Sequence, residues 1–358
     1  MKPIKAGLIG CGFISSIYLE NCRNFQSMDI VACADLNREN AERQARDFDI
    51  PRTCSVDELL ADPEIDIVLN LTIPAAHAEI SLKAIEAGKH VYMEKPLSIS
   101  LKDGRAVLDA AAEKGVRVGG APDTFLGGGI QTALKLIEDG WIGRPVAATA
   151  FFMSRGVEKW HPNPDFYYQP GGGPMFDMGP YYLTTLVSLL GSVKRVTGSV
   201  QTSFDVRTTP EGRSIPVEVP THITGSLDFE NGAVGTVITS FDSVGNNLPR
   251  MEIHGETGTL SVPDPNHFGG EVLVKKLGRK QFENVPLTHG WTDNSRGIGL
   301  ADMAEALLEK RPHRANDQLQ YHVLEIMHAF HTASEENKHI TINSRIEKPA
   351  ALAMQQIF

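Results

Sequence analysis

The sequence predicts an α/β protein of two domains, in which a doubly wound parallel sheet is followed by an α+β domain around a largely antiparallel open sheet. The chain has 358 residues, and at roughly 150 residues per domain that length accommodates two domains. Short apolar runs alternate with helical patterns over the first third, whereas strand patterns linked by Gly, Asn and Asp turns prevail later. We therefore expect domains at 1–121 and 122–358.

In the first domain, five apolar runs are expected to form the parallel sheet. These runs are residues 4–9, 30–34, 65–71, 90–93 and 116–118. The segments between them have helical periodicity, and they are residues 14–25, 39–48, 55–61, 77–87 and 101–114. Gly88 and Gly115 follow the last two segments, as helix C-terminal glycines do. Strands separated by helices require right-handed crossovers, so the sheet is predicted to be parallel and covered on both faces.

In the second domain, helical and strand patterns no longer alternate regularly. The expected strands are residues 146–153, 193–203, 221–229, 233–241, 250–255 and 258–262. The expected helices are residues 130–139, 178–190, 299–310 and 317–337. Residues 156–174 are rich in Pro and Gly and are expected to form a loop. Consecutive strands linked by short turns favour antiparallel pairing.

The net charge and the cysteine content indicate which partners and which cellular compartment to expect. The chain has 34 Lys and Arg against 44 Asp and Glu, and its net charge of −10 repels nucleic acid backbones. No run approaches the roughly 18 unbroken apolar residues of a membrane span. We therefore expect neither a nucleic acid nor a membrane partner. The cysteines, at 11, 22, 33 and 54, form no C-x-x-C pair and predict free thiols in a reducing compartment, the cytoplasm.

The turn between the first strand and the first helix has the pattern of a dinucleotide site. Gly10 permits a tight turn, Gly12 lets a pyrophosphate approach the backbone, and the helix N-terminus behind them offers N–H groups to the anion. Ser15 occupies the third, small position of this fingerprint. Asp35 follows the second strand, where a carboxylate binds both ribose hydroxyls and disfavours a 2′-phosphate, or caps the next helix. NAD is therefore expected, although Arg38 nearby leaves NADP possible.

Two later segments resemble the signatures of one enzyme family. Residues 87–96 read AGKHVYMEKP and residues 171–181 read GGGPMFDMGPY. They are similar to the AGKHV-x-x-EKP and GGG-x-x-x-D-x-G-x-H signatures of the Gfo/Idh/MocA oxidoreductases, which include glucose–fructose oxidoreductase and inositol dehydrogenase. The resemblance covers nearly the whole chain, and it implies a Rossmann domain that binds NAD or NADP. The residues expected to contact the cofactor are Gly10, Gly12, Phe13, Ile14, Asp35, Arg38, Thr72, Pro74, His77, Glu94 and Lys95.

The second signature departs from the family pattern at its last residue. Many members have histidine there, whereas this chain has Tyr181, as glucose–fructose oxidoreductase and some ketosugar reductases of the family do. Oxidation of an alcohol by a nicotinamide requires a proton acceptor at the hydroxyl, and Tyr181 is the candidate, with a core aromatic residue as the alternative. A phenol has an ordinary pKa of about 10, and an ammonium group at Lys95 would stabilise the phenolate and the developing alkoxide.

Asp177 completes the predicted catalytic set. The resemblance implies that it binds a substrate hydroxyl and holds Lys95, and a charge at a helix N-terminus is the alternative. It precedes Tyr181 by one helical turn, so both side chains would project from one face if the helix has already begun there.

The loop before the glycine run is expected to bind the substrate. Trp160 would stack on a sugar face while Arg155 and His161 form hydrogen bonds with hydroxyl groups. Ordinary loop packing is an equal alternative for each. The polar stretch 289–296 is a further candidate for substrate contact, with helix entry and subunit packing as the alternative. Three histidines share the last helix, and because only the final two have a spacing that puts them on one face we expect no metal site. They are His322, His328 and His331.

The leading hypothesis is an NAD(P)-dependent dehydrogenase or reductase. It would transfer a hydride between the nicotinamide and a secondary hydroxyl, or the corresponding ketone, of a sugar, sugar derivative or cyclic polyol. One alternative is an NAD-dependent glycosidase of the same fold, which would release free sugar without net NADH formation. Another is a non-catalytic dinucleotide-binding sensor, against which the presence of Lys95 argues. The open sheet is expected to pair subunits into a homodimer or homotetramer.

Overall fold

The computed structural model describes residues 2–354, which form two compact units. Unit 1 contains the chain up to Leu126 together with Asp293–Tyr321, and unit 2 contains Gly127–Thr292 together with His322–Met354. The predicted boundary at residue 121 assigned all later residues to the second domain, whereas Asp293–Tyr321 belongs to unit 1. That segment contains a helix that packs on the last strand of the first sheet, a contact between distant segments that no local pattern reveals.

Unit 1 is built on a five-stranded sheet in the order β2-β1-β3-β4-β5, and every pairing in it is parallel. This confirms the predicted doubly wound fold. The strands are β1 (Ile4–Ile9), β2 (Met28–Ala34), β3 (Ile67–Asn70), β4 (His90–Met93) and β5 (Val118–Gly120). In this order β1 and β3 are neighbours, and the chain winds outward from them in opposite directions. Ligands of such sheets bind beyond the carboxyl ends of the strands at this switch point.

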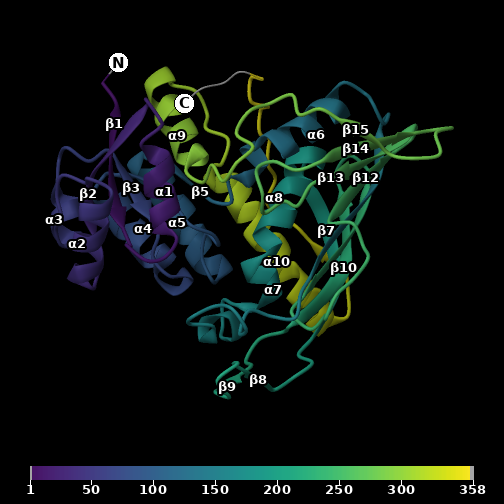
Figure 1. The fold of residues 1–358 in the computed structure, drawn as a ribbon, viewed down its shortest axis with the longest axis horizontal. Helices are drawn as coiled ribbons and strands as arrows, with labels where there is room; N and C mark the ends of the chain where they lie inside the picture. Colours follow the sequence, from purple (N-terminus) through teal and green to yellow (C-terminus); the bar gives the residue numbers. More distant parts are fainter. Residues whose placement is uncertain (1, 355–358) are drawn as a thin grey trace. The chain divides into compact units, whose positions relative to one another are not determined.

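The helices of unit 1 begin and end where local chemistry allows. They are α1 (Ser15–Cys22), α2 (Arg38–Asp47), α3 (Val56–Ala61), α4 (His77–Glu86), α5 (Leu101–Lys114) and α9 (Ile298–Glu309), with short 3₁₀ turns η1 (Pro74–Ala76) and η2 (Thr124–Leu126). Ser55 and Glu58 form a capping box at α3. Gly115, with φ of +67°, ends α5. Figure 1 shows α1 and α9 side by side, in agreement with their contacts.

Unit 2 contains a nine-stranded sheet in the order β15-β14-β13-β12-β6-β11-β10-β7-β16. Its pairings are antiparallel except that of β6 with β11, which confirms the predicted open, largely antiparallel sheet. The strands are β6 (Pro145–Met153), β7 (Val193–Gln201), β10 (His222–Phe229), β11 (Val234–Ser240), β12 (Met251–Gly255), β13 (Gly258–Val262), β14 (Val272–Lys276), β15 (Glu283–Val285) and β16 (Ile340–Thr341). A separate hairpin joins β8 (Val206–Thr208) to β9 (Ser214–Pro216).

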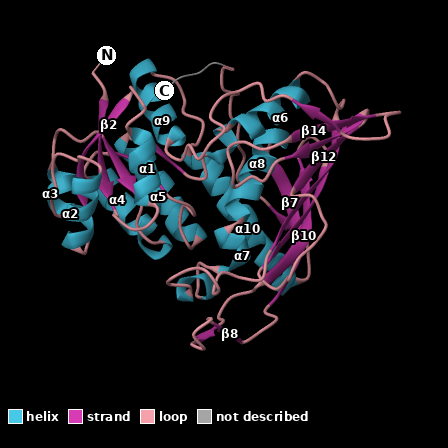
Figure 2. Ribbon diagram, viewed as in Figure 1, coloured by secondary structure: helices cyan, strands magenta, loops and turns pink. Residues whose placement is uncertain are grey.

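The helices of unit 2 gather on one face of its sheet, as Figure 2 shows. They are α6 (Gly128–Glu138), the 3₁₀ turn η3 (Asp165–Tyr168), α7 (Gly173–Asp177), α8 (Gly179–Leu190) and most of α10 (Asp317–Glu336). Helix α8 is buried along its whole length, and Phe330 of α10 packs against two glycines of β7 and β10. The core of unit 2 therefore lies between α8, α10 and the sheet.

Several elements differ from the sequence expectation. The segment 156–174, expected to be a loop, contains η3 and the start of α7. Helices α7 and α8 are separate. Pro174 lies in the first turn of α7 and Pro180 in the first turn of α8, and Met178 interrupts the helical structure between them. The short strands β8, β9, β14, β15 and β16 were not predicted. Within residues 2–354, none of the helices is both long and apolar enough to cross a membrane.

Candidate functional site

The glycine turn after β1 has the shape of a cradle for a phosphate group. Gly10 has φ of +99°, and a Cβ atom there would lie 2.6 Å from the backbone of Leu71, so only glycine fits. A Cβ atom on Gly12 would meet nothing within 4 Å, which means that the space above this residue is open. Helix α1 begins at Ser15, whose hydroxyl donates to the Gly12 carbonyl at 2.6 Å. The turn thus presents a helix N-terminus beneath an open space, as anion binding requires.

Asp35 lies directly after β2 and is held by the backbone on both sides. Its Oδ2 accepts from the amide of Cys11 at 2.7 Å and its Oδ1 from the amide of Asn37 at 2.8 Å. The carboxylate is half-buried and fixed beside the glycine turn. Arg38, the predicted contact for a 2′-phosphate, forms an ion pair with Glu42 at 2.8 Å within α2. The fixed charge at this edge is therefore negative, which disfavours a 2′-phosphate.

Large apolar side chains are exposed at the ends of three neighbouring strands. Phe13 after β1, Leu36 after β2 and Ile73 after β3 are 95%, 101% and 66% exposed. Exposed apolar groups gathered at the carboxyl edge of a parallel sheet indicate a binding site, and the flat rings of a dinucleotide would cover them. The open cradle, the fixed carboxylate and these side chains fit NAD. Leu36 and Ile73 were missed from sequence, although their place next to Asp35 and Thr72 was the available signal.

Lys95 follows β4 in a turn that a buried carboxylate supports. Glu94 accepts from the Tyr18 hydroxyl at 2.7 Å and from the Lys95 backbone amide at 3.0 Å. Glu94 is buried, so the structure gives it the role of holding the turn to α1. Lys95 itself is half-buried, and it lies at the same edge of the sheet as the glycine turn.

The loop after β3 contains the other residues expected at the cofactor. The Thr72 hydroxyl donates to Oδ1 of Asn70 at 2.6 Å, and Pro74 begins the 3₁₀ turn η1. His77 is buried at the start of α4. Its two ring nitrogens lie 2.7 Å from the Pro96 carbonyl and 2.9 Å from the Thr72 carbonyl. Both ring nitrogens therefore face backbone carbonyl groups, and neither faces the proposed dinucleotide site at the carboxyl edge of the sheet.

In unit 2, Asp177 and Tyr181 lie on consecutive helices. Asp177 is the last residue of α7 and is half-buried, whereas Tyr181 is buried near the start of α8. The condition for placing both on one helical face is not met, because the break at Met178 separates them. The glycine run before α7 is packed closely. A Cβ atom on Gly172 would lie 2.5 Å from the Phe166 carbonyl oxygen, so the run and the preceding loop are in contact.

In the candidate substrate loop, Arg155 is packed against other protein groups whereas Trp160 is exposed. The Arg155 guanidinium donates to the Asp242 carbonyl at 3.4 Å and lies over the Phe204 ring at 5.0 Å, which supports the packing alternative. Trp160 is 69% exposed and contacts the His161 ring edge to face at 5.5 Å. Nδ1 of His161 accepts from the amide of Asn163 at 3.1 Å, so Nε2 carries the proton and can donate.

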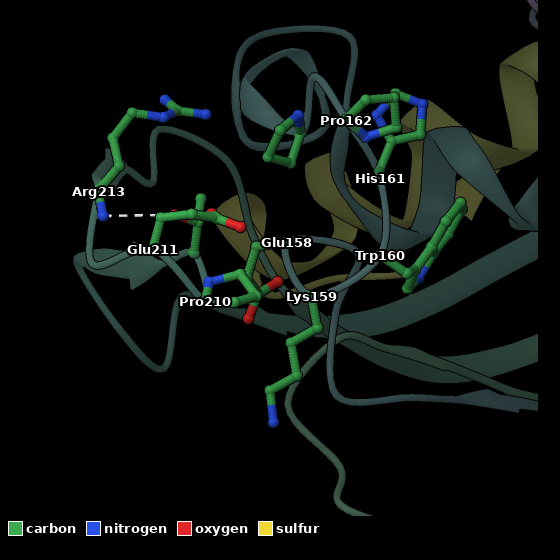
Figure 3. Close-up of a pocket in the computed structure, with 10 residues that line it drawn as sticks. Glu158, Lys159, Trp160, His161, Pro162, Pro210, Glu211 and Arg213 are labelled. Carbon is green, nitrogen blue, oxygen red and sulfur yellow. Dashed lines mark hydrogen bonds between the residues drawn. The ribbon is translucent and has the colours of Figure 1, made fainter.

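A cavity of about 280 Å³ lies between this loop and the β8–β9 hairpin. Its lining includes His161 and Pro162 from the loop and Pro210, Glu211 and Arg213 from the hairpin. Figure 3 shows the Trp160 side chain on the far side of the loop from the hairpin residues. Trp160 is nevertheless one of the residues that line the cavity, so the exposed indole and the cavity belong to the same feature of unit 2.

A buried ionic cluster fastens the hairpin to the loop. Arg207 of β8 is buried and pairs with Asp242, and it lies 3.7 Å from the Glu158 carboxylate. Glu158 accepts from the Tyr168 hydroxyl, and burial together with this carboxylate raises the pKa of Tyr168 above its ordinary value. The Thr221 hydroxyl donates to Asp242 at 2.7 Å. This arrangement joins segments that lie far apart in the sequence.

The histidines of the last helix have structural contacts. His322 accepts from the Val193 amide at 3.0 Å through Nε2, and its Nδ1 contacts the Ser344 hydroxyl at 2.7 Å. His328 and His331 pack their rings against Phe176. From the polar stretch 289–296, His289 is buried with Nε2 at 3.2 Å from the Leu352 carbonyl. Among residues 2–354, no group of three or more His, Cys, Asp and Glu side chains could hold a metal ion.

Comparison with known proteins connects these features to a family. A model described as "Oxidoreductase family, NAD-binding Rossmann fold" matches residues 4–120, and one described as "GFO/IDH/MocA C-terminal domain" matches residues 130–261. Levoglucosan dehydrogenase of Pseudarthrobacter phenanthrenivorans is 28% identical over 73% of each chain. The 1,5-anhydro-D-fructose reductase of Ensifer adhaerens is 28% identical over 75% of this chain and 77% of that one. A levoglucosan dehydrogenase structure with NADH and L-sorbose has the same fold, with a TM-score of 0.83 and 24% identity over 96% of this chain and 100% of that one.

Proposed function

The chain belongs to the Gfo/Idh/MocA oxidoreductase family, and from that membership we propose that it oxidises a secondary hydroxyl of a sugar, sugar derivative or cyclic polyol, or reduces the corresponding ketone, with NAD as the preferred cofactor. The named relatives support this substrate class, since they include a levoglucosan dehydrogenase, an anhydrofructose reductase and inositol dehydrogenases. The family that the two sequence signatures predicted is confirmed.

One observation carries the proposal for NAD. The glycine turn leaves open space above Gly12 at the N-terminus of α1, while the carboxylate of Asp35 is fixed beside it by two backbone amides. A pyrophosphate fits the first feature and unmodified ribose hydroxyls fit the second. The residues we propose to hold the dinucleotide are Gly10, Gly12, Phe13, Ile14, Asp35, Leu36, Thr72, Ile73 and Pro74. NAD, when bound, supplies a hydride acceptor.

The residues of the chain would supply binding and proton transfer. We propose that Tyr181 accepts the hydroxyl proton and that Asp177 binds a neighbouring hydroxyl of the substrate. The Lys95 ammonium would stabilise the phenolate and the developing alkoxide. The carboxylate of Glu94 supports the Lys95 role, because it holds the Lys95 amide while Tyr18 holds the carboxylate. Trp160 and His161 remain candidates for contact with the rest of the substrate.

The experiment is an absorbance assay for NADH formation with NAD or NADP and a panel of neutral aldoses, anhydrosugars, glycosides, inositols and sugar acids. We expect a rise with one substrate class, and Lys95→Ala should abolish it while NADH binding persists. Turnover of Lys95→Ala within a few-fold of the wild type would contradict the mechanism. The reverse assay, NADH oxidation with ketosugars, covers a reductase. Release of free sugar without NADH formation would indicate the glycosidase alternative instead.

We also propose a homodimer or homotetramer that pairs through the helix-free face of the unit 2 sheet. On this face β11 exposes Val234 and Thr236 and half-exposes Ile238, and sheet faces of this kind form symmetric interfaces. Light scattering at micromolar concentration tests the proposal, and a mass of 39.1 kDa, that of one chain, would contradict it. The four cysteines are free, which supports the further proposal of a cytoplasmic location.

A further inference from the structure

The imidazole of His77 joins two backbone segments. Its Nδ1 lies 2.7 Å from the carbonyl oxygen of Pro96, its Nε2 lies 2.9 Å from that of Thr72, and the residue is 1% exposed. Carbonyl oxygens only accept hydrogen bonds. A neutral ring donates to one of them, and a doubly protonated ring donates to both. In each state the ring lies between the turn after β4 and the loop after β3, but only the doubly protonated ring forms a hydrogen bond with both.

Both connected segments belong to the proposed active site. Pro96 directly follows Lys95, the proposed catalytic ammonium. Thr72 lies in the loop whose first residue, Leu71, packs against Gly10, since a Cβ atom on that glycine would lie 2.6 Å from the Leu71 backbone. His77 is therefore placed between the lysine turn and the backbone that supports the dinucleotide turn.

Neighbouring contacts make this connection rigid. Asn70, buried at the end of β3, accepts from the amide and hydroxyl of Thr72 at 3.2 and 2.6 Å. Its Nδ2 donates to the backbone carbonyl of His77 at 3.0 Å. On the other side of the lysine turn, Glu94 holds the Lys95 amide. Without the ring of His77, the turn would keep its Glu94 contact and the hydrogen bond from the Glu94 amide to the Asn70 carbonyl at 3.0 Å, but the contacts of the ring with Pro96 and Thr72 would be lost.

We propose that His77 is a positioning residue, which sets the place of Lys95 relative to the glycine turn through its contacts with Pro96 and Thr72. The inference rests on the proposed catalytic role of Lys95. It replaces the direct cofactor contact expected for His77 from sequence, because the ring is buried and its nitrogens face the backbone. Misplacement of a catalytic group by about 1 Å costs on the order of 100-fold in rate.

The test compares His77→Phe with His77→Gln. Phenylalanine fills the space without an N–H group, whereas the glutamine amide offers two N–H groups for carbonyl oxygens. We expect kcat of His77→Phe to fall by roughly 10- to 100-fold, with a smaller change in the NADH dissociation constant, and we expect partial recovery in His77→Gln. His90→Phe is the matched control, since this half-buried histidine at the start of β4 accepts from the Arg117 amide at 2.9 Å.

Hydrogen exchange of the Lys95 and Leu97 amides provides a readout that needs no substrate. Exchange should accelerate in His77→Phe and not in His90→Phe. If the wild type neither oxidises a sugar or polyol nor reduces the corresponding ketone, the proposed function fails, but faster exchange at this turn would still support the positioning role. Unchanged exchange in His77→Phe, or loss of kcat equal to that of His90→Phe, would overturn it.

Discussion

At the scale of single residues, we expect cofactor choice to depend on the charge of Asp35. We predict that Asp35→Asn lowers the preference for NADH over NADPH by about tenfold, because removing a fixed negative charge beside a 2′-phosphate changes binding by roughly 1 to 2 kcal/mol. Titration of nicotinamide fluorescence with both dinucleotides measures this without a substrate. The asparagine Oδ1 can still accept from one of the amides of Cys11 and Asn37, so the turn is not left wholly unsupported.

Arg38→Ala is the companion variant for this prediction. The arginine forms an ion pair with Glu42 and is exposed, so its removal should leave NADH affinity nearly unchanged. If Asp35→Asn leaves the ratio of the two affinities as it was, the carboxylate does not select the cofactor. If Arg38→Ala selectively weakens NADPH, the arginine leaves its Glu42 contact to bind the 2′-phosphate.

At the scale of secondary structure elements, the N-terminus of α9 is capped by a distant carboxylate. Asp123 is buried, and its Oδ2 accepts from the amides of Gly297 and Gly299 at 2.9 and 3.1 Å. Burial raises the pKa of Asp123 to about 6, against an ordinary value of 3.8, while the two amides oppose the rise. The folded protein therefore binds this proton more tightly than the unfolded chain does. The stabilisation is complete below pH 3.8 and is lost as the pH rises through about 6.

We predict that Asp123→Asn gains stability relative to the wild type as the pH rises. Between pH 5 and pH 8 the difference in the free energy of unfolding should change by roughly 1 kcal/mol in favour of the variant. Urea unfolding of both proteins at the two pH values measures it, and the comparison cancels the pH dependence of the other groups. Parallel pH dependences of the two proteins would show that Asp123 does not titrate in this range.

The β8–β9 hairpin is held by a buried charge. Arg207→Met should reduce the free energy of unfolding by about 3 to 5 kcal/mol, because it leaves the carboxylates of Glu158 and Asp242 buried without their cation. Arg213→Met removes an exposed ion pair with Asp165 from the same hairpin and serves as the control, with little expected effect. Equal losses in both variants would mean that the buried cluster has no special role.

The β8–β9 hairpin also shows which secondary structure elements cannot be predicted from sequence patterns. The strands and helices of unit 1 were predicted closely because each has an apolar run or period of its own, as in β4 and α5. Strands β8 and β9 have three residues each, too few for a period, and they depend on the contacts of Arg207 with distant carboxylates. The helix predicted at 178–190 is present as α8, but the short helix α7 that Pro174 starts just before it was not predicted.

The same limit applies to the candidate site. The glycine turn, Asp35 and Lys95 could be named as candidates from sequence, because their proposed chemistry depends on residue type at a fixed place after a strand. The role of His77 could not, because it depends on two backbone carbonyl groups whose positions come from folding. Leu36 and Ile73 carry no chemical signal as residue types, so their place next to Asp35 and Thr72 was the only sequence signal, and their exposure in the structure distinguishes them from core residues.

At the scale of the whole molecule, each unit contains a buried histidine that makes it sensitive to acid. In unit 1, Nε2 of His313 contacts the Val118 carbonyl at 3.1 Å, and in unit 2, Nε2 of His322 accepts from the Val193 amide at 3.0 Å. Burial lowers the pKa of each residue to about 4 from an ordinary 6.5. Both are therefore neutral in the folded state at pH 6, where the unfolded chain is largely protonated.

Because the pKa of each histidine is lower in the folded state than in the unfolded chain, its contribution to the free energy of unfolding is complete above pH 6.5. That contribution is lost as the pH falls through about 4. Each histidine should remove about 2 kcal/mol from the stability of its unit between pH 7 and pH 5. Because a chain of two units need not unfold in one step, hydrogen exchange resolved by unit is the appropriate measurement. We predict that His313→Gln reduces the acid sensitivity of unit 1 and that His322→Gln reduces that of unit 2. A variant that changes both units equally would show that acid unfolding is a property of the chain as one cooperative body.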